Sequence, residues 1–398
     1  ATFWVRMLQA GKDSNDNGRN ESSVKCHFSK VAEAYTFRKD HKIYNDEIKG
    51  PPVRPLCDGS DTIIRRFSFI ISKMLQEINI YKESACDSTE DMLAAIKESN
   101  EVLGDENRKI TIGSADVKAL YPSLDIPYTI EIVCEELYKS DIRFEGVDTE
   151  ELGLYLSLNR DTTYLKERGV YEYCPYREER ARGPKPKITS SGIEIKKERR
   201  FRLWKTRQKE PNEDKIRQMM REAFKIALEL ILNKHIYIFN NEMKVQQKGG
   251  PIGLDITGVI AKIFMCWWDD EFIKRLNKAN IKTYLYKRYV DDMNTCVNVI
   301  TAGMKWNNGK LVYDENIVEE EAKKEDDTRT FQIIKEIGDE IHQSIQIEID
   351  VPSNHEDNKI PILDLKVWIE TEEIGGKVVN KILHEFYIKD VSSKFLVN

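Results

Sequence analysis

The feature that most constrains the fold of this chain is a pair of adjacent carboxylates, Asp291 and Asp292, between two segments with strand-like sequence. Residues 281–288 and 293–299 carry β-branched and aromatic residues in partial alternation, which predicts strand, turn and strand. Two acids at the tip of an apolar hairpin repel each other at neutral pH unless a cation lies between them. Mg²⁺ is the natural candidate, because it prefers carboxylate oxygens and shares its coordination shell with substrate phosphates. A solvated Asp-Asp turn is the alternative.

A third carboxylate, Asp116, has a similar context earlier in the chain. Residues 109–112 predict a short strand that runs up to it, and Pro122 indicates a turn after it. A helix over about 128–138 follows, with apolar residues on one face. A lone Asp at the end of a strand is more often a cap or a turn former. Together with the Asp-Asp hairpin, it becomes a candidate for the other half of a two-metal site, in which the ions lie about 3.5–4 Å apart.

A glycine-rich segment lies between these two acidic positions. It runs from Gln246 to Gly258, and the apolar residues 259–268 after it predict a helix. Glycines before a helix allow a nucleotide or a nucleic acid to approach the backbone closely, although an ordinary loop and cap has the same pattern. The order of strand with Asp, glycine loop with helix, and Asp-Asp hairpin is more informative than any of the three alone.

In this order and in these residues the chain resembles reverse transcriptases, and more narrowly the enzymes of Penelope-like retroelements. Asp116–Tyr121 is similar to the first palm motif of the family, and Tyr289–Asp292 matches the third. Residues 230–240, with Gln246 and the glycine loop, resemble the second. Residues 345–365 are similar to the segment that ends in the primer-grip hairpin, and residues 386–396 to the stretch that leads into the thumb. The family continues after the glycine loop with a small residue and Pro, where this chain has Leu254 and Asp255, so it resembles a divergent member.

The resemblance implies a right-hand polymerase of the α/β (α+β) class, with fingers and a palm whose antiparallel sheet is backed by helices. We expect a flexible N-terminal segment at 1–30, fingers at 31–108 and a palm at 109–398 that ends at the start of the thumb, so the thumb is largely absent. Within the palm we expect a basic insertion at 160–215 and an acidic insertion at 301–330. The chain is expected to be a segment of a longer protein.

The resemblance also implies an activity, RNA-directed DNA synthesis, and a set of site residues. Its partners are an RNA template, a DNA primer and deoxynucleoside triphosphates, and its cofactor is Mg²⁺, with Mn²⁺ as a substitute. The catalytic residues are Asp116, Asp291 and Asp292, and the metal ligands are these carboxylates with the carbonyl of Val117. The expected nucleotide-binding residues are Lys42, Arg54, Tyr121, Gln246 and Gly249. The expected nucleic-acid-binding residues are Gly253, Lys196, Lys197, Arg199, Arg200, Trp204 and Leu363.

Three of these roles have a physical reason beside the resemblance. Lys42 and Arg54 would neutralise charge on the leaving pyrophosphate, with a solvated basic strand as the alternative. Tyr121 lies shortly after Asp116, where the family places an aromatic ring beneath the sugar. A ring there collides with a ribose 2′-hydroxyl and favours deoxynucleotides. The alternative is that Tyr121 is a core aromatic residue.

The net charge of −6 argues mildly against a nucleic-acid-binding protein, so the distribution of charge matters. Basic residues far outnumber acids over 177–209, where Phe201 and Trp204 are interleaved with them. Such a segment suits a phosphate backbone and unstacked bases, and a solvated loop is the alternative. The acidic clusters at 314–327 and 269–271 are interpreted as solvated surface, the latter as the solvated end of a helix.

The seven cysteines contain no CxxC pair and the six histidines have no zinc spacing, so neither a disulfide framework nor a structural metal is predicted. This usage fits an intracellular protein, nuclear or cytoplasmic. No apolar run is long enough to span a membrane. Alternative functions are a non-catalytic RNA-binding scaffold on the palm fold, an RNA-synthesising polymerase and a telomerase-type enzyme. Template, priming mode and oligomeric state stay open.

Overall fold

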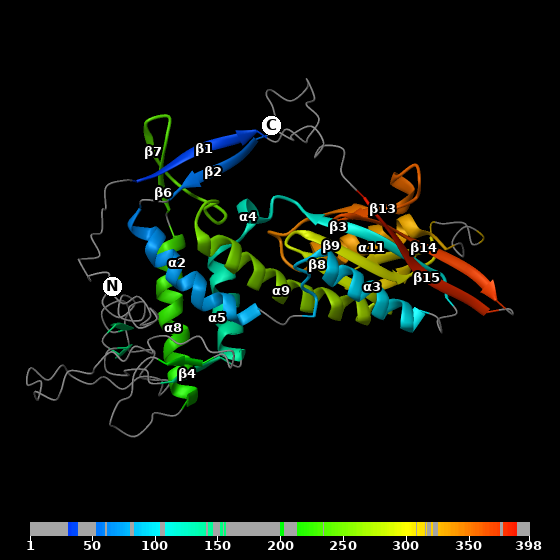
Figure 1. The fold of residues 1–398 in the computed structure, drawn as a ribbon, viewed down its shortest axis with the longest axis horizontal. Coiled ribbons are helices and arrows are strands. Elements are labelled where there is room, and N and C mark those ends of the chain that lie inside the picture. Colours follow the sequence, from blue (N-terminus) through cyan, green and yellow to red (C-terminus); the bar gives the residue numbers. More distant parts are fainter. Residues whose placement is uncertain are drawn as a thin grey trace, which may run out of the picture. The chain divides into compact units, whose positions relative to one another are not determined.

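The structure of the chain is a computed structural model. It describes residues 31–38, 53–59, 62–79, 83–103, 108–140, 142–145, 152, 153, 155, 156, 200–202, 213–233, 235–307, 309–314, 316, 320, 325–374 and 377–387. These residues form helices together with antiparallel and mixed β-sheets, so the chain is of the mixed α/β class that the sequence predicts (Figure 1).

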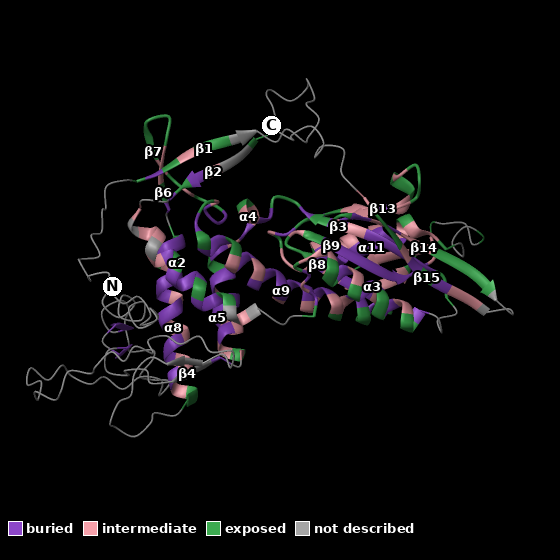
Figure 2. Cartoon of the chain, in the orientation of Figure 1, coloured by how far each residue is buried: buried purple, intermediate pink, exposed green. Residues whose placement is uncertain are grey.

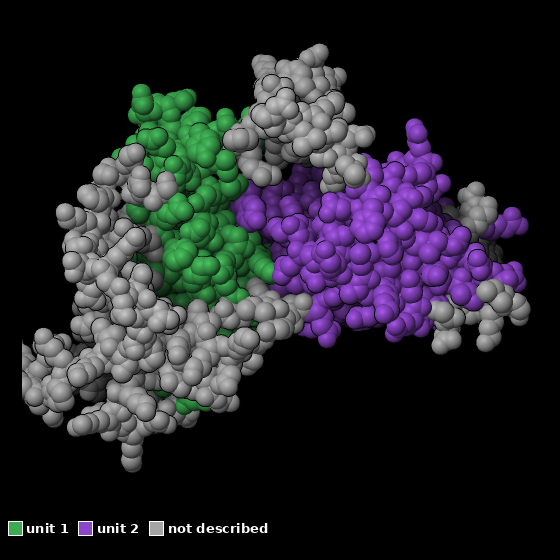
Figure 3. Space-filling model, in the orientation of Figure 1, with its two compact units in different colours: residues 1–39, 44–80, 125–264 green, residues 40–43, 81–124, 265–398 purple. Residues whose placement is uncertain are grey.

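The chain divides into two compact units, each made of segments that are separated in the sequence (Figure 3). Unit 1 comprises residues 1–39, 44–80 and 125–264, and unit 2 comprises residues 40–43, 81–124 and 265–398. The sequence instead predicts domains that are consecutive ranges, and the assignment of these ranges to fingers and palm stays a prediction.

Unit 1 contains a four-stranded mixed sheet with the strand order β2-β1-β6-β7, in which β1 and β6 are parallel and the other neighbours antiparallel. Its strands are β1 (Ala32–Arg38), β2 (Val53–Asp58), β6 (Ile236–Phe239) and β7 (Glu242–Val245), with a small parallel pair of β4 (Arg143–Glu145) and β5 (Arg200–Arg202). Its helices are α2 (Ile63–Leu75), the 3-10 turn η1 (Gln76–Asn79), α5 (Ile126–Lys139), α8 (Glu213–Leu232) and the first part of α9 (Asp255–Lys278).

The helices of unit 1 pack through their apolar faces, α5 and α2 both against α8. Val133 and Leu137 of α5, Phe224 and Leu228 of α8, and Ile71 of α2 are almost completely buried (Figure 2). Each helix has charged residues on the opposite side, which is the pattern of an amphipathic helix on a core.

Unit 2 is built on an antiparallel sheet with the strand order β12-β3-β9-β8. The strands are β3 (Ile110–Val117), β8 (Thr283–Tyr289), β9 (Asp292–Asn298) and β12 (Ile347–Asp350). A second sheet contains β13 (Ile360–Ile362), β14 (Leu365–Ile374) and β15 (Lys377–Phe386), and β10 (Met304–Asn307) pairs with β11 (Lys310–Tyr313). The helical elements are α3 (Thr89–Leu103), α4 (Leu120–Ser123), the second part of α9, α11 (Asp327–Asp339) and the 3-10 turn η2 (Pro352–Asn354).

The two faces of the sheet β12-β3-β9-β8 carry different layers, because successive residues of a strand point to opposite sides. On β3, Gly113 faces the ring of Phe331 of α11, where an added Cβ would lie 2.4 Å from ring carbons. Ile110 and Ile112 belong instead to a core cluster shared with Ile96 of α3 and with residues of the β13-β14-β15 sheet. The sheet therefore lies between α11 on one face and α3 with the three-stranded sheet on the other.

Several predicted elements agree with the structure. The helix expected over about 128–138 is α5, which begins after Asp125, whose side chain accepts a hydrogen bond from the Tyr128 amide. The hairpin expected around Asp291 is formed by β8 and β9. The helix expected after the glycine loop is α9, and residues on all its sides are buried, as expected for a helix within a core.

Cys57, Cys86, Cys134, Cys266 and Cys296 are buried, and these five residues form no disulfide in the described part of the chain. Burial raises the pKa of the Cys134 and Cys296 thiols well above the ordinary value, so they are protonated core residues. No helix within the described ranges combines the length and the apolar character that crossing a membrane requires.

Candidate active site

The structure brings Asp116, Asp291 and Asp292 together at one end of the sheet of unit 2. Asp116 of β3 pairs with Asp292 of β9, and Asp291 lies in the turn just before β9. One carboxylate oxygen from each residue lies within 4.8 Å of the others. Asp116 and Asp292 are exposed and Asp291 is half-buried, so an ion or a substrate can reach all three.

The chemistry of these donors fits a hard divalent cation. Carboxylate oxygens are the ligands that Mg²⁺ prefers, and Mg²⁺ binds through one or two carboxylates together with substrate phosphates. Three neighbouring carboxylates repel one another, and a cation among them removes that repulsion. Within the described residues no other group of His, Cys, Asp or Glu side chains has this geometry.

The turn that carries Asp291 has an unusual backbone. Tyr289 pairs with Asp292, so the turn has two central residues, Val290 and Asp291. Val290 has a φ of 56°, in the left-handed region that a β-branched residue rarely adopts. Such a residue costs about 1–3 kcal/mol and persists only where the surrounding structure holds it. The turn at the acidic site is therefore strained.

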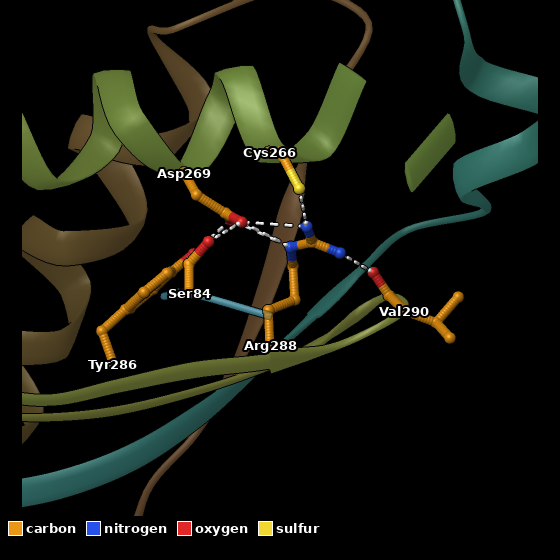
Figure 4. Close-up of polar contacts among 6 residues, drawn as sticks. All are labelled: Ser84, Cys266, Asp269, Tyr286, Arg288 and Val290. Atoms are coloured by element: carbon orange, nitrogen blue, oxygen red, sulfur yellow. Dashed lines mark hydrogen bonds and ion pairs between the residues drawn. The ribbon is translucent and has the colours of Figure 1, made fainter. Parts of the chain in front are cut away.

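Two hydrogen bonds from different strands hold this turn. The amide of Val117 on β3 donates to the carbonyl of Asp291 over 3.1 Å, which ties the turn to the strand that carries Asp116. Nη1 of Arg288 donates to the carbonyl of Val290 over 2.6 Å (Figure 4). The side chain of Val117 is buried, and the expected role of its carbonyl as a metal ligand stays a prediction.

Arg288 is itself fixed by a buried carboxylate of α9, Asp269. Nε of Arg288 lies 2.9 Å and 3.0 Å from the two carboxylate oxygens, and Nη2 lies 2.9 Å from Oδ2. The hydroxyls of Ser84 and Tyr286 also donate to Asp269, over 2.9 Å and 2.7 Å (Figure 4). The side chains of Asp269 and Arg288 are 0% and 2% exposed. The interpretation of residue 269 as part of a solvated helix end is therefore wrong, because its charge is paired inside the core.

The charges in this buried group reinforce one another. Burial by itself opposes the charged form of Arg288, but the Asp269 carboxylate raises the pKa of the guanidinium above its ordinary value. Burial, followed by the Asp269 charge, raises the pKa of the Tyr286 hydroxyl well above its ordinary value. The guanidinium of Arg288 is therefore charged at neutral pH, and the Tyr286 hydroxyl keeps its proton there and donates a hydrogen bond to Asp269.

A fourth acid, Glu348 of β12, is in register with Asp116 on the side away from Asp292. Directly opposite residues of antiparallel strands point to the same face, so the three acids form one row across the sheet. Nζ of Lys118 lies 3.3 Å from a Glu348 oxygen, and both side chains are 62% exposed. Glu348 is not among the site residues that the sequence predicts. The alternation of Ile345, Ile347 and Ile349 with polar residues was the available signal, because it separates Glu348 from the buried face.

Two other predicted site residues also lie in unit 2. Tyr121 is half-buried in the short helix α4, which follows β3, and Ala119 before this helix has a φ of 51°. Leu363 lies in the two-residue turn between β13 and β14, has a φ of 53° and packs against the core cluster that contains Ile112. The packing gives Leu363 a structural role, and contacts of Tyr121 with a nucleotide and of Leu363 with a nucleic acid stay predictions.

The glycine loop lies in unit 1, so the structure assigns its residues to a different unit from the carboxylates. The side-chain Nε2 of Gln246 donates to the carbonyls of Lys248 and Gly249, and thus shapes the loop. Gly253 has a φ of 122°, and an added Cβ would lie 2.1 Å from the carbonyl oxygen of Cys57 on β2. Close backbone packing therefore requires glycine at 253, and nucleotide or nucleic-acid contacts of Gln246, Gly249 and Gly253 stay predictions.

The remaining predicted residues are basic or aromatic. The backbone of Arg54 is part of β2, opposite Phe37 of β1, but its side chain lies outside what the structure describes. The same is true of the side chain of Arg200, whose backbone forms the start of β5. Lys42, Lys196, Lys197, Arg199 and Trp204 lie outside the described residues altogether.

No protein-family model and no curated protein matches this chain. Among solved structures it is similar to telomerase from Candida albicans in complex with a fragment of telomeric RNA, at 12% identity and a TM-score of 0.43, over 91% of this chain and 48% of that chain. It is also similar to the BmCPV RNA-dependent RNA polymerase, at 10% identity and a TM-score of 0.38, over 92% of this chain and 22% of that chain. It is similar as well to a chain from a segmented genome and RNA polymerase complex inside a double-stranded RNA virus, at 10% identity and a TM-score of 0.36. This similarity covers 91% of this chain and 22% of that chain. The chain thus spans about half or less of the length of these polymerase chains.

Proposed function

We propose that this chain contains the catalytic centre of a template-directed nucleic-acid polymerase, and specifically of an RNA-directed DNA polymerase of a Penelope-like retroelement. The observation that carries the proposal is the convergence of Asp116, Asp291 and Asp292, from two paired strands and the turn between β8 and β9. An Asp at the end of one strand beside an Asp-Asp turn is the arrangement that the sequence resemblance implies for such an enzyme. In this proposal unit 2 contains the palm.

The reaction would join a nucleotide to a primer. The 3′-hydroxyl oxygen of the primer forms a bond to the α-phosphorus of a deoxynucleoside triphosphate, and the bond to the leaving pyrophosphate breaks. Asp116, Asp291 and Asp292 would hold Mg²⁺, or Mn²⁺ in its place, which when bound would lower the pKa of the attacking hydroxyl and offset charge on the leaving group. Tyr121 would favour a deoxyribose, and Lys42 and Arg54 would bind the triphosphate.

Primer extension tests this proposal. The chain is incubated with an RNA template of poly(rA), an oligo(dT) primer, thymidine triphosphate and either Mg²⁺ or Mn²⁺. Extension by the parent and a loss of at least about 100-fold in Asp291→Asn, the scale expected for removal of one group that stabilises charge, would support it. The control is Glu372→Gln, on the exposed side of β14, which is expected to extend the primer at the parental rate.

The same assay separates the alternatives. Extension with ribonucleotides at the deoxynucleotide rate would replace the proposal with an RNA-synthesising polymerase. Absence of extension, also in a chain lengthened beyond residue 398, together with tight RNA binding would replace it with a non-catalytic scaffold. A preference for a telomeric-repeat template over poly(rA) would indicate a telomerase-type enzyme.

A further inference from the structure

The ion pair between Asp269 and Arg288 is adjacent to the turn that carries the acidic site, because Arg288 also donates a hydrogen bond to that turn (Figure 4). A guanidinium has five N–H donors in a fixed fork, so it can address two acceptors in different directions. Here Nε and Nη2 face Asp269, whereas Nη1 donates to the carbonyl of Val290. One side chain thus connects the buried part of α9 to the strained residue of the turn.

The backbone of Arg288 is held by hydrogen bonds as well. The backbone amide of Arg288 donates to the carbonyl of Ser84 over 2.8 Å, and the amide of Cys86 donates to the carbonyl of Arg288 over 2.9 Å. Asp269 cannot move independently, because Ser84 and Tyr286 also donate to its carboxylate. The position of the guanidinium is therefore determined at its backbone and at its head group.

We propose that Arg288 and Asp269 are positioning residues, which hold the turn of Val290 and Asp291 in its strained shape and thereby set the affinity of the acidic site for divalent metal. The inference rests on the proposed function, because that function makes the three carboxylates a metal-binding centre. Val290 adopts a backbone conformation that its side chain disfavours, and the hydrogen bond from Arg288 opposes its relaxation. Relaxation would move Asp291 away from Asp116 and weaken the shared site. Groups that orient metal ligands without touching the metal commonly have this effect.

A substitution that keeps the charge separates positioning from simple stabilisation. Lysine at 288 retains a positive charge near Asp269, but its single ammonium group lacks the fork that reaches the carbonyl of Val290 as well. Glycine at 290 adopts a positive φ without strain, so a turn with glycine does not need the hydrogen bond. The proposal therefore predicts that Val290→Gly rescues Arg288→Lys.

The test measures binding of Mn²⁺ alone by electron paramagnetic resonance, with the binding that disappears in Asp291→Asn taken as the signal of the site. Arg288→Lys is expected to weaken Mn²⁺ affinity by about 10- to 100-fold. In a Val290→Gly background the same change is expected to weaken it by less than about threefold, because the relaxed turn no longer depends on Arg288. Unchanged affinity in Arg288→Lys, an equal loss in both backgrounds, or no Asp291-dependent binding in the parent would each overturn the proposal.

Two further variants keep this test decisive. Ile382→Val shortens a buried side chain of β15 in the same unit, so it lowers stability without touching the turn and should leave Mn²⁺ affinity unchanged. If Arg288→Lys does not fold, the pair Asp269→Asn/Arg288→Gln replaces it with the same expected and overturning results, because it leaves no unpaired buried charge.

The two assays distinguish failure of the polymerase function from failure of the positioning role. A parent that binds Mn²⁺ through Asp291 but extends no primer would contradict the polymerase function, while the rescue by Val290→Gly would still decide the positioning role. Extension by the parent, together with an unchanged Mn²⁺ affinity in Arg288→Lys, would support the polymerase function and overturn the positioning role of Arg288.

Discussion

Asp116 of β3 lies directly opposite Asp292 of β9 in an antiparallel pair. The Cβ atoms of such partners are about 4.5–5.5 Å apart, and like charges at this position destabilise a sheet. Asp291 adds a third charge within the same small volume. Folding and the binding of a cation are therefore linked at this site, because a cation that binds the folded chain stabilises it.

Asp116→Asn is expected to make the chain more stable in the absence of divalent metal. Removal of one of the facing charges should raise the free energy of unfolding by about 0.2–1 kcal/mol in EDTA. The same substitution should reduce the stabilisation that Mg²⁺ gives to the parent. Thermal unfolding in EDTA and in Mg²⁺ measures both effects, with Glu372→Gln on β14 as the control. A lower melting temperature of Asp116→Asn in EDTA would contradict the prediction.

Gly113→Ala is expected to destabilise unit 2. The new Cβ would lie 2.4 Å from carbon atoms of the Phe331 ring, so the buried ring has to move, at a cost of about 1–3 kcal/mol. Urea unfolding measures this cost. The matched control is Gly258→Ala on α9, where nothing lies within 4 Å of the added atom. This substitution should raise the free energy of unfolding by about 0.5–1 kcal/mol, because alanine favours the helix over glycine.

A second substitution tests the cause of that loss. In Gly113→Ala/Phe331→Leu the smaller side chain leaves room for the Cβ, so the two changes together should cost less than the sum of the separate changes. Strict additivity would show that the ring of Phe331 is not what excludes a side chain at 113.

Tyr121→Val is expected to raise the incorporation of ribonucleotides relative to deoxynucleotides by about tenfold or more, because a smaller side chain no longer meets the 2′-hydroxyl. Primer extension with each nucleotide, compared as kcat/KM, measures this ratio. Tyr128→Val, at an exposed position on α5 in unit 1, serves as the control aromatic substitution. An unchanged ratio in Tyr121→Val would remove the residue from the sugar site.

Stability should fall as the pH decreases through about 6.5, the ordinary pKa of histidine. His235 is buried, with Nε2 3.4 Å from Sγ of Cys57, and burial lowers its pKa in the folded chain. Between the lowered value and about 6.5 the unfolded chain binds more protons than the folded chain, so the free energy of unfolding decreases as the pH falls. Above about pH 7 this contribution is constant.

Urea unfolding between about pH 5 and 7.5 measures the effect of this histidine. In His235→Leu the dependence should be flatter than in the parent. His384→Gln, on the exposed part of β15, should leave the parental dependence intact. An equally steep dependence in the parent and in His235→Leu would assign the effect to other groups.

Local patterns predicted the elements of the site well. The alternation around Asp291 gave the hairpin β8–β9, and the strand before Asp116 gave β3, because both signals lie within a few neighbouring residues. That Asp116 and the Asp-Asp hairpin share one site was a hypothesis from their chemistry and order, which the family resemblance supported. The pairing of β3 with β9 that brings them together is not predicted by any local pattern.

The errors and omissions concern partners that are distant in the sequence. The acids that follow Asp269 indicate a solvated residue, but its charge is paired with Arg288, which lies on a separate strand and is not visible in a local pattern. Glu348 was overlooked because its place beside Asp116 depends on the register of β12 against β3. The segments that make up each unit are not predicted either, since each unit combines segments that are separated in the sequence.

The position of β3 inside its sheet has a consequence for how the chain is made. Both of its neighbours, β9 and β12, lie far downstream in the sequence. At a synthesis rate of about 5–20 residues per second, β3 leaves the ribosome roughly ten to forty seconds before β9 is complete. During that interval both edges of β3 lack their final partners, although Ile96 of α3, in the same core cluster as Ile110 and Ile112, precedes the strand. Unpaired edges are the condition under which strands pair with other chains. Pairing of β3 with a strand of another chain therefore stays possible until β9 has been synthesised.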